Sequence, residues 1–281
     1  MAKISRRGFF KRAAVMGAIP LVATAQEHKE APTLKFVHIT DSHMDLSDSD
    51  SVEAMKLMVR FMNTNYKDLD FVLFGGDNFN NNVPGNKDAM VFKEIIEQLP
   101  CPAYVVRGNK ESSPAKDQSI DLSEFKKMFL DHEEMHVVGK DWKIEQKGYL
   151  LLGLDSCIEG QNNGLYTQET IAFADKALRE GKPTIILNHH PYTNYWGGTE
   201  KKDLHKYVLN NTQEVQDLLF KYDNLILTLS GHKHIDSVTQ INQAKVIVTR
   251  GFIRPLDLDM FPMRYVEITG SKIQEKMIYT A

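Results

Sequence analysis

The sequence predicts an α/β fold, in which sheets of apolar strands are covered by helices. Short apolar runs such as 34–40 and 70–74 have the length of buried strands. Between them, segment 51–63 repeats its apolar residues at helical spacing. The C-terminal segment 238–279 is rich in further strand-like runs. Because strands with no polar face must be buried on both sides, we expect helices to cover the sheets.

The elements follow one another in a regular order. Pro100 and Pro102 end the helix at 88–99, because proline cannot continue a helix. Thr167 is a good N-cap for a later helix, which Gly181 ends. The expected helices are 51–63, 88–99, 122–130, the one between Thr167 and Gly181, and 212–221; the expected strands are 34–40, 70–74, 103–106, 137–138, 142–146, 149–154, 184–187, 225–229, 238–241, 245–248, 264–268 and 272–279.

The composition is that of an ordinary globular protein of 281 residues, 42% hydrophobic and 25% charged. The formal net charge is -3, and the first 25 residues hold five basic and no acidic residues, so their removal would leave -8. An acidic chain argues against a nucleic-acid duplex as partner, since that needs a basic face. It does not exclude a small phosphorylated substrate. The two cysteines, Cys101 and Cys157, fit either buried thiols or a single bridge.

The N-terminal segment has the layout of an export signal. Basic residues precede an apolar run at 13–22, and the small residues Ala23-Thr24-Ala25 follow it. The pair Arg6-Arg7 resembles a bacterial twin-arginine signal. Since the apolar run is shorter than the roughly 20 residues that span a bilayer, we expect cleavage and no lasting membrane anchor. We therefore expect a signal peptide at 1–25, a single folded domain at 26–281, the twin-arginine export machinery as a partner, and a periplasmic or secreted protein.

Polar groups follow five of the predicted strands, at the point where each strand ends. In sheets of this class, ligands bind beyond the carboxyl ends of the strands, so these groups are expected at one rim. Each group alone is an ordinary turn sequence, and only their joint occurrence indicates a site. The five groups are Asp41-Ser42-His43, Gly75-Gly76-Asp77-Asn78, Gly108-Asn109-Lys110-Glu111, Asn188-His189-His190-Pro191 and Gly231-His232-Lys233-His234.

The residue types in these groups are metal ligands. Carboxylate, carboxamide and imidazole groups suit Mn, Fe and Zn. Asp41 and His43 are two residues apart, so both can face the same side of an extended chain, and His232 and His234 repeat that spacing. His38, within the first strand, is expected to be an ordinary core or edge histidine.

This ordered set resembles the calcineurin-like metallophosphoesterase superfamily over roughly 35–268, and most of all its bacterial cyclic-nucleotide-phosphodiesterase-like members. The resemblance implies a two-sheet α/β/β/α sandwich and two divalent metal ions, with a metal-bridging hydroxide that attacks phosphate monoesters or diesters. A purple acid phosphatase would have Tyr in place of Asn80. By the family pattern, Asp41, His43 and His234 would hold the first metal, Asn109, His189 and His232 the second, and Asp77 would bridge both.

The sequence departs from the family at Lys110, where a histidine usually follows Gly-Asn. Lysine supplies a positive charge and N–H donors. We expect Lys110 to clamp phosphate oxygens, paired with or oriented by Glu111, and to act in catalysis with Asn109 and Asp77. The alternative is that Lys110 points to solvent.

Other residues beside these groups are candidate substrate contacts. We expect Asn78, His190 and Tyr192 to bind substrate with Lys110. Tyr192, Tyr195 and Trp196 would either stack on a base or sugar or pack a loop, and Arg250 and Arg254 either bind phosphate or serve the surface. A rival hypothesis is a catalytically weakened envelope protein that binds metal or nucleotides.

Overall fold

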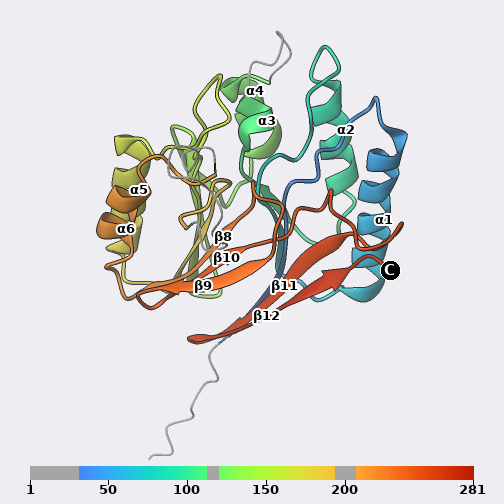
Figure 1. Ribbon diagram of the computed structural model, residues 1–281. Coiled ribbons are helices and arrows are strands. Elements are labelled where there is room, and N and C mark those ends of the chain that lie inside the picture. Colours follow the sequence, from blue (N-terminus) through green and yellow to red (C-terminus); the bar gives the residue numbers. More distant parts are fainter. Residues whose placement is uncertain (1–31, 113–119, 194–206) are drawn as a thin grey trace, which may run out of the picture. The chain divides into compact units, whose positions relative to one another are not determined.

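The computed structural model describes residues 32–112, 120–193 and 207–281. Within these residues the strands form two sheets (Figure 1). Apolar side chains from both sheets, including Val37, Leu187 and Leu229, belong to one buried cluster. Helices α1 and α2 flank one side of the molecule in Figure 1, and α5 and α6 flank the other. The α/β fold and the two-sheet sandwich are therefore confirmed.

The first sheet has the order β12-β11-β1-β2-β3. Strands β1, β2 and β3 are parallel, and β11 pairs antiparallel with β1. All four residues of β2 are buried, because both of its faces are covered. The strands are β1 (Thr33–Ile39), β2 (Phe71–Phe74), β3 (Ala103–Val105), β11 (Pro262–Thr269) and β12 (Lys272–Tyr279).

The second sheet has the order β4-β5-β6-β7-β8-β10-β9. Its central strands β6, β7, β8 and β10 are parallel, and antiparallel strands close both edges. The strands are β4 (His136–Val138), β5 (Asp141–Gln146), β6 (Tyr149–Gly153), β7 (Thr184–Leu187), β8 (Leu225–Ser230), β9 (Ser237–Ile241) and β10 (Ala244–Val248). The carboxyl ends of β1, β2, β3, β7 and β8 are where the polar groups begin.

Apart from the single turn α3, each helix buries apolar side chains on one face. In α1, Met55, Met58 and Met62 are buried, as the periodicity predicts. Thr167 caps α5 by accepting a hydrogen bond from the Thr170 N–H, which confirms its predicted role. The helices are α1 (Ser49–Asn65), α2 (Lys87–Ile96), α3 (Asn109–Ser112), α4 (Leu122–Phe129), α5 (Gln168–Leu178) and α6 (Thr212–Leu219).

The structure adds one element that the sequence analysis did not predict. Helix α3 is a single turn that starts at Asn109, too short to show a hydrophobic period. Both cysteines are free thiols, so the single bridge is not formed. The predicted signal peptide lies outside the described residues, as do Tyr195 and Trp196. No helix in the described parts of the chain has the length and apolar character needed to cross a membrane.

Candidate metal centre

The polar groups occupy tight turns directly after five strands. Asp41, His43, Asp77, His232 and His234 all have positive φ angles, between 45° and 66°. Such angles cost energy for residues with a side chain, and they persist where the surroundings enforce them. Here the Asp41 N–H donates to Gly76 O at 3.0 Å and the His43 N–H donates to Asp77 O at 2.9 Å. The turns after β1 and β2 therefore hold each other in place.

Asp41, His43 and His234 come together as a first ligand group. The Nε2 atoms of His43 and His234 are 3.1 Å apart, and His234 Nε2 is 3.2 Å from Asp41 Oδ1. The three side chains offer ligand atoms that all lie within 4.8 Å of one another. Asp41 and His43 are buried, whereas His234 keeps 22% of its side chain exposed. This group is the one that the resemblance implies for the first metal.

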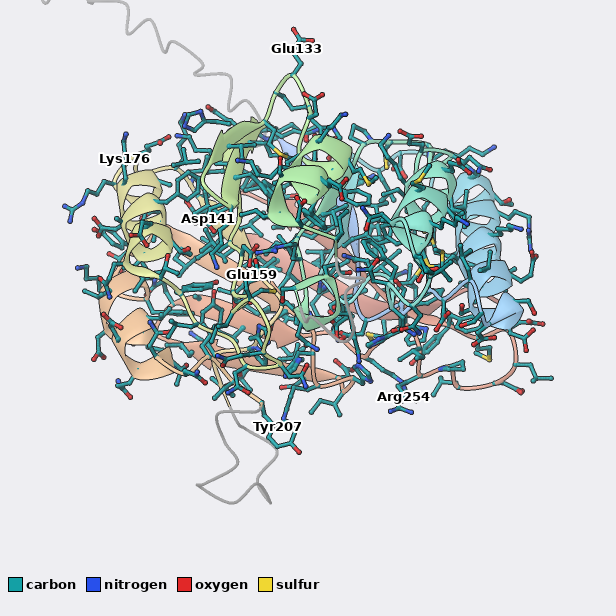
Figure 2. All side chains as sticks on the ribbon, turned by 90° about the horizontal axis from the view of Figure 1, so that it is seen from above. Glu133, Asp141, Glu159, Lys176, Tyr207 and Arg254 are labelled. Carbon is teal, nitrogen blue, oxygen red and sulfur yellow. The ribbon has the colours of Figure 1, made fainter. Side chains whose placement is uncertain are left out.

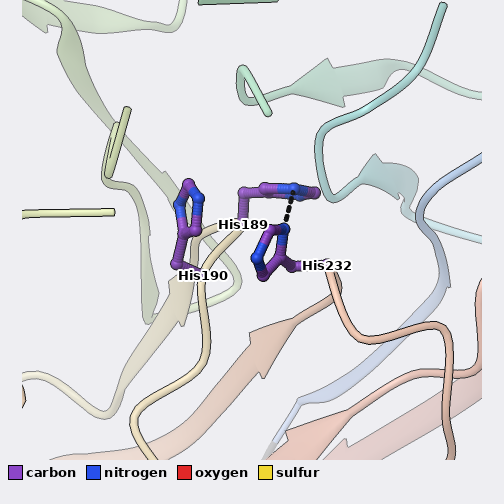
Figure 3. Close-up of side chains that lie close together, drawn as sticks. All are labelled: His189, His190 and His232. Atoms are coloured by element: carbon purple, nitrogen blue, oxygen red, sulfur yellow. Dashed lines mark hydrogen bonds between the residues drawn. The ribbon is translucent and has the colours of Figure 1, made fainter. Parts of the chain in front are cut away.

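Asn109, His189 and His232 form a second ligand group. His189 Nε2 is 3.2 Å from Asn109 Oδ1 and 3.2 Å from His232 Nδ1, and His232 Nδ1 is 3.0 Å from Asn109 Oδ1. Figure 3 shows the rings of His189 and His232 meeting at these atoms. They come from different strands of the second sheet, β7 and β8, while Asn109 follows β3 of the first. The site therefore lies where the two sheets meet.

Asp77 lies between the two groups. Its Oδ1 is 3.5 Å from His189 Nε2, and its Oδ2 is 3.7 Å from His43 Nε2. Burial opposes ionisation of Asp77, but the nearby positive charge and hydrogen bond of His189 outweigh it and hold the pKa of Asp77 well below normal. Burial disfavours the charged form of His189 as well. The negative charge of Asp77 nevertheless raises the pKa of His189 to about 9. Asp77 is thus a negative centre between the two groups that attracts cations.

Hydrogen bonds on the outer side of the rings fix which nitrogen faces the site. His189 Nδ1 donates to Gly75 O at 2.9 Å, so Nε2 is the nitrogen that faces the site and would bind a metal after losing its proton. His43 Nδ1 lies 3.0 Å from Asn80 Oδ1, and Asn80 in turn donates to Asp45 Oδ2 at 3.1 Å. Outer hydrogen bonds of this kind orient the histidine ligands of metal sites. Nitrogen and oxygen ligand atoms that converge at about 3 Å need a shared proton or a cation between them, and these residue types are metal ligands, so they fit a metal centre.

Glu111 has a role that the sequence analysis assigned wrongly. It is completely buried, and its oxygens accept from the N–H groups of Gly108, Asp77 and Asn78 at 2.6, 3.1 and 2.6 Å. Both oxygens are therefore used to join the turns after β2 and β3, and Glu111 does not pair with Lys110. The position of Glu111, three residues after Gly108 at the start of a helical turn, resembles a capping box and was the available signal.

Lys110 is exposed to solvent. Its backbone N–H donates to Asp77 Oδ1 at 2.7 Å, which helps to fix the central carboxylate. The side chain is thus available to a ligand that approaches from solvent.

Three predicted substrate contacts, Asn78, His190 and Tyr192, are almost fully buried in the structure. Asn78 donates to Val106 O, and the Tyr192 hydroxyl bonds the Tyr166 hydroxyl at 2.6 Å. His190 has a nitrogen within 4.8 Å of those of His189 and His232, but its ring is already committed to protein partners. Tyr192 thus packs in the core, and substrate contacts by Asn78 and His190 stay a prediction.

The remaining histidine and arginine predictions have mixed outcomes. His38 is fully buried, as expected, and its Nδ1 lies 2.8 Å from Thr249 Oγ1, but among the described residues its Nε2 has no hydrogen-bond partner; burial lowers its pKa to about 3. Arg254 is exposed and Arg250 is half-buried, and Arg250 Nε donates to Arg254 O at 2.8 Å. Their loop adjoins the first group, because the Ile253 N–H donates to Asp41 O at 3.1 Å. Neither arginine is one of the grouped ligands.

The fold and the site define a metal-dependent hydrolase. Residues 34–236 match the family model described as calcineurin-like phosphoesterase. The chain therefore belongs to the calcineurin-like phosphoesterase family and is a metal-dependent phosphoesterase.

Curated relatives cover much of the chain. A protein of Arcobacter nitrofigilis named "probable glycerophosphodiester phosphodiesterase" is 28% identical over 68% of this chain and 66% of its own length. A 3',5'-cyclic adenosine monophosphate phosphodiesterase of Haemophilus influenzae is 22% identical over 78% of this chain and 77% of its own length. The chain thus spans about two-thirds to three-quarters of the length of these relatives.

Solved structures support the fold. A dimetal phosphatase from Danio rerio has a TM-score of 0.64 at 11% identity, covering 90% of this chain and 100% of its own. A purple acid phosphatase from yellow lupin has a TM-score of 0.61 at 15% identity, covering 89% of this chain and 52% of its own. At these identities the likeness concerns the fold alone.

Proposed function

We propose that this protein is an exported phosphodiesterase with a dinuclear metal centre. The observation that carries the proposal is the meeting of two separate ligand groups at one carboxylate. Asp77 lies 3.7 Å from His43 of the first group and 3.5 Å from His189 of the second, through different oxygens. A carboxylate with one oxygen toward each group is suited to bridge two cations.

The chain's own residues set up the chemistry. Two divalent cations, when bound, would activate water and neutralise charge on the phosphoryl group. Gly75 O and Asn80 hold His189 and His43 in the tautomers that ligation requires. Glu111 anchors the turns that carry Asp77 and Asn109. These hydrogen bonds build the site before substrate arrives, which favours a preorganised electrostatic centre.

Diesters are the substrate class that we favour. The names of the relatives from Arcobacter nitrofigilis and Haemophilus influenzae specify a glycerophosphodiester and a cyclic nucleotide, and both are phosphodiesters. An exported enzyme of this kind would cleave diesters such as cyclic nucleotides or phospholipid headgroups outside the cytoplasm, and each cleavage would give a phosphomonoester and a free hydroxyl group.

The test is to prepare the protein without metal, reload it with Mn, Fe or Zn, and measure hydrolysis of nitrophenyl diesters and monoesters. We expect two metal ions per chain and faster diester hydrolysis. Metal binding without hydrolysis of any ester would instead support a binding protein of the envelope. A panel of glycerophosphodiesters and cyclic nucleotides then narrows the natural substrate.

Lys110 is proposed to bind phosphoryl oxygens through its exposed ammonium group. Lys110→Ala should lower the rate on esters with good and with poor leaving groups by a similar factor if lysine only clamps phosphate. A larger loss for poor leaving groups would show that it also donates a proton. Unchanged rates on both would mean that Lys110 points to solvent.

Export is proposed from residues 1–25 through the twin-arginine route. Replacement of Arg6 and Arg7 by lysine should retain the unprocessed protein in the cytoplasm, whereas the native chain should be found processed outside it. Equal export of both forms would contradict this route.

A further inference from the structure

Asn162 lies beside the second ligand group, in the loop between β6 and α5. Its Oδ1 is 3.4 Å from the Nδ2 atom of Asn109, and its side chain is exposed. Asn109 Oδ1 faces His189 and His232, so its Nδ2 must be the donor in this contact. Asn162 therefore directs its oxygen toward Asn109, which leaves its own amide N–H groups for another partner.

The backbone of Asn162 is held from behind. His190 Nε2 donates to Asn162 O at 3.1 Å, while His190 Nδ1 lies 2.8 Å from Ser156 Oγ in the buried interior. A Cβ atom added to Gly164 would lie 2.3 Å from His190 Cγ, so the loop fits closely around this ring. His190 thus serves to position Asn162.

The other side of the loop is fixed by a buried arginine. Arg107 is almost completely buried and donates to Glu159 Oε1 at 2.7 Å and to Asp155 Oδ2 at 2.6 Å. The Gly160 N–H donates to Ser112 O at 2.9 Å, which ties the loop to α3. Figure 2 shows Glu159 near the middle of the molecule in the view from above. A loop held at both sides can present one side chain in a defined position.

Among the described residues, the Asn162 Nδ2 atom has no recorded hydrogen-bond partner. This exposed amide lies next to Asn109, a candidate ligand of the second metal, so a phosphoryl group bound to that metal would come close to it. Phosphoryl transfer builds negative charge on the non-bridging oxygens, and a fixed N–H donor stabilises that charge. A neutral amide does so without competing for the metal.

We propose that Asn162 is a phosphoryl-binding residue, which donates a hydrogen bond from its side-chain amide to a non-bridging oxygen of the substrate. The inference rests on the proposed diesterase function and deepens it. It identifies a contact contributed by a loop that holds none of the grouped ligands.

The test compares Asn162→Ala and Asn162→Asp in the metal-loaded full-length protein. Aspartate keeps the acceptor for Asn109 but lacks the amide donor and repels phosphate. We expect kcat/KM on a nitrophenyl diester to fall about tenfold to 100-fold for alanine and further for aspartate, at unchanged metal content. The affinity for inorganic phosphate, measured by calorimetry, should fall by at least tenfold in both variants. Asn163→Ala, at the next position of the same loop, is the matched control and should behave as wild type.

Other results would overturn the proposal. If the Asn162→Asp variant is active and the Asn162→Ala variant is impaired, Asn162 only supports Asn109. Loss of metal in either variant would lead to the same conclusion. Wild-type activity and phosphate affinity in the Asn162→Ala variant would show that the Asn162 amide makes no contact with the substrate. If the unsubstituted, metal-loaded protein cleaves no ester, the proposed function fails instead, and the two failures are thereby distinguished.

Discussion

The two ligand groups are supported in different ways. In the first group, His43 is oriented by the side chain of Asn80, which depends in turn on the side chain of Asp45. In the second group, His189 is oriented by a backbone oxygen, Gly75 O. Exposure does not separate the groups, because each has one partly exposed histidine, His234 in the first and His232 in the second.

This difference has a consequence for metal binding. A backbone carbonyl next to a parallel strand has little freedom, so the second group is the more preorganised of the two. Side-chain support, such as that of Asn80 for His43, can relax more easily. We therefore expect the second group to bind its metal more tightly than the first, and both to depend on Asp77.

Asp77→Asn should have the largest effect, because Asp77 is shared by both groups. The amide keeps the shape and the acceptor for the Lys110 N–H but removes the negative charge. Activity should fall at least about 10³-fold, since several kcal/mol of metal-dependent stabilisation are lost. Metal analysis should show that both ions bind weakly. Loss of one ion with the other kept at wild-type affinity would mean that Asp77 serves only one group.

Gly76→Ala should damage the second group through the backbone. Gly76 has a φ of 89°, and an added Cβ would lie 2.7 Å from both Gly108 N and His189 Nδ1. The combined backbone and steric cost should lower the free energy of unfolding by about 2–4 kcal/mol. Gly85→Ala is the control, because Gly85 has a φ of 78° with nothing within 4 Å. Equal losses in chemical denaturation would mean that only the backbone angle matters.

Asn80→Ala should weaken the first group alone. The variant frees His43 to rotate and to change tautomer, so the weaker of the two metal affinities should fall about tenfold to 100-fold. Asn82→Ala is the control, since Asn82 also donates to Asp45 Oδ2 but does not contact His43. Calorimetry that shows both sites weakened equally would remove the distinction between the groups.

Asp141→Asn should have the smallest effect. It changes the residues that support the second group from behind, and the effect is on stability. Asp141 accepts from the Asp155 N–H, and Asp155 pairs with the buried Arg107. Burial raises the pKa of Asp141 to about 7. This folded-state pKa lies above the unfolded value of about 3.9, so ionisation of Asp141 lowers the stability of the native protein. The loss of stability grows as the pH rises from about 4 to 7.

The asparagine variant removes that penalty. At pH 8 it should be more stable than the native protein by about 1 kcal/mol, and at pH 4 the gain should disappear. Thermal unfolding at several pH values measures the difference. A gain of the same size at every pH would rule out ionisation of Asp141 as its cause.

The fold and the ligand candidates could be predicted because they depend on local patterns. Apolar runs of strand length located β1, β2, β7 and β8, and the polar residues that follow each run proved to meet in space. The supporting residues were harder to find. Glu111 acts on Asp77, 34 positions earlier in the chain, and Asn80 acts on His43, 37 positions earlier. These contacts depend on how the turns fold against one another.

The errors have the same origin. Tyr192 follows a candidate ligand in sequence, but the turn after His190 directs it into the core beside Tyr166 and Phe220. Adjacency in the chain therefore indicated the neighbourhood of the site but not the direction of each side chain. Asn162 escaped notice because nothing in its local sequence distinguishes it from an ordinary loop asparagine.

The most direct test of the dinuclear assignment is anomalous X-ray diffraction from crystals grown with Mn²⁺. We predict two peaks per chain, one enclosed by Asp41, His43 and His234, the other by Asn109, His189 and His232, with Asp77 touching both. A single peak, or peaks away from Asp77, would contradict the assignment.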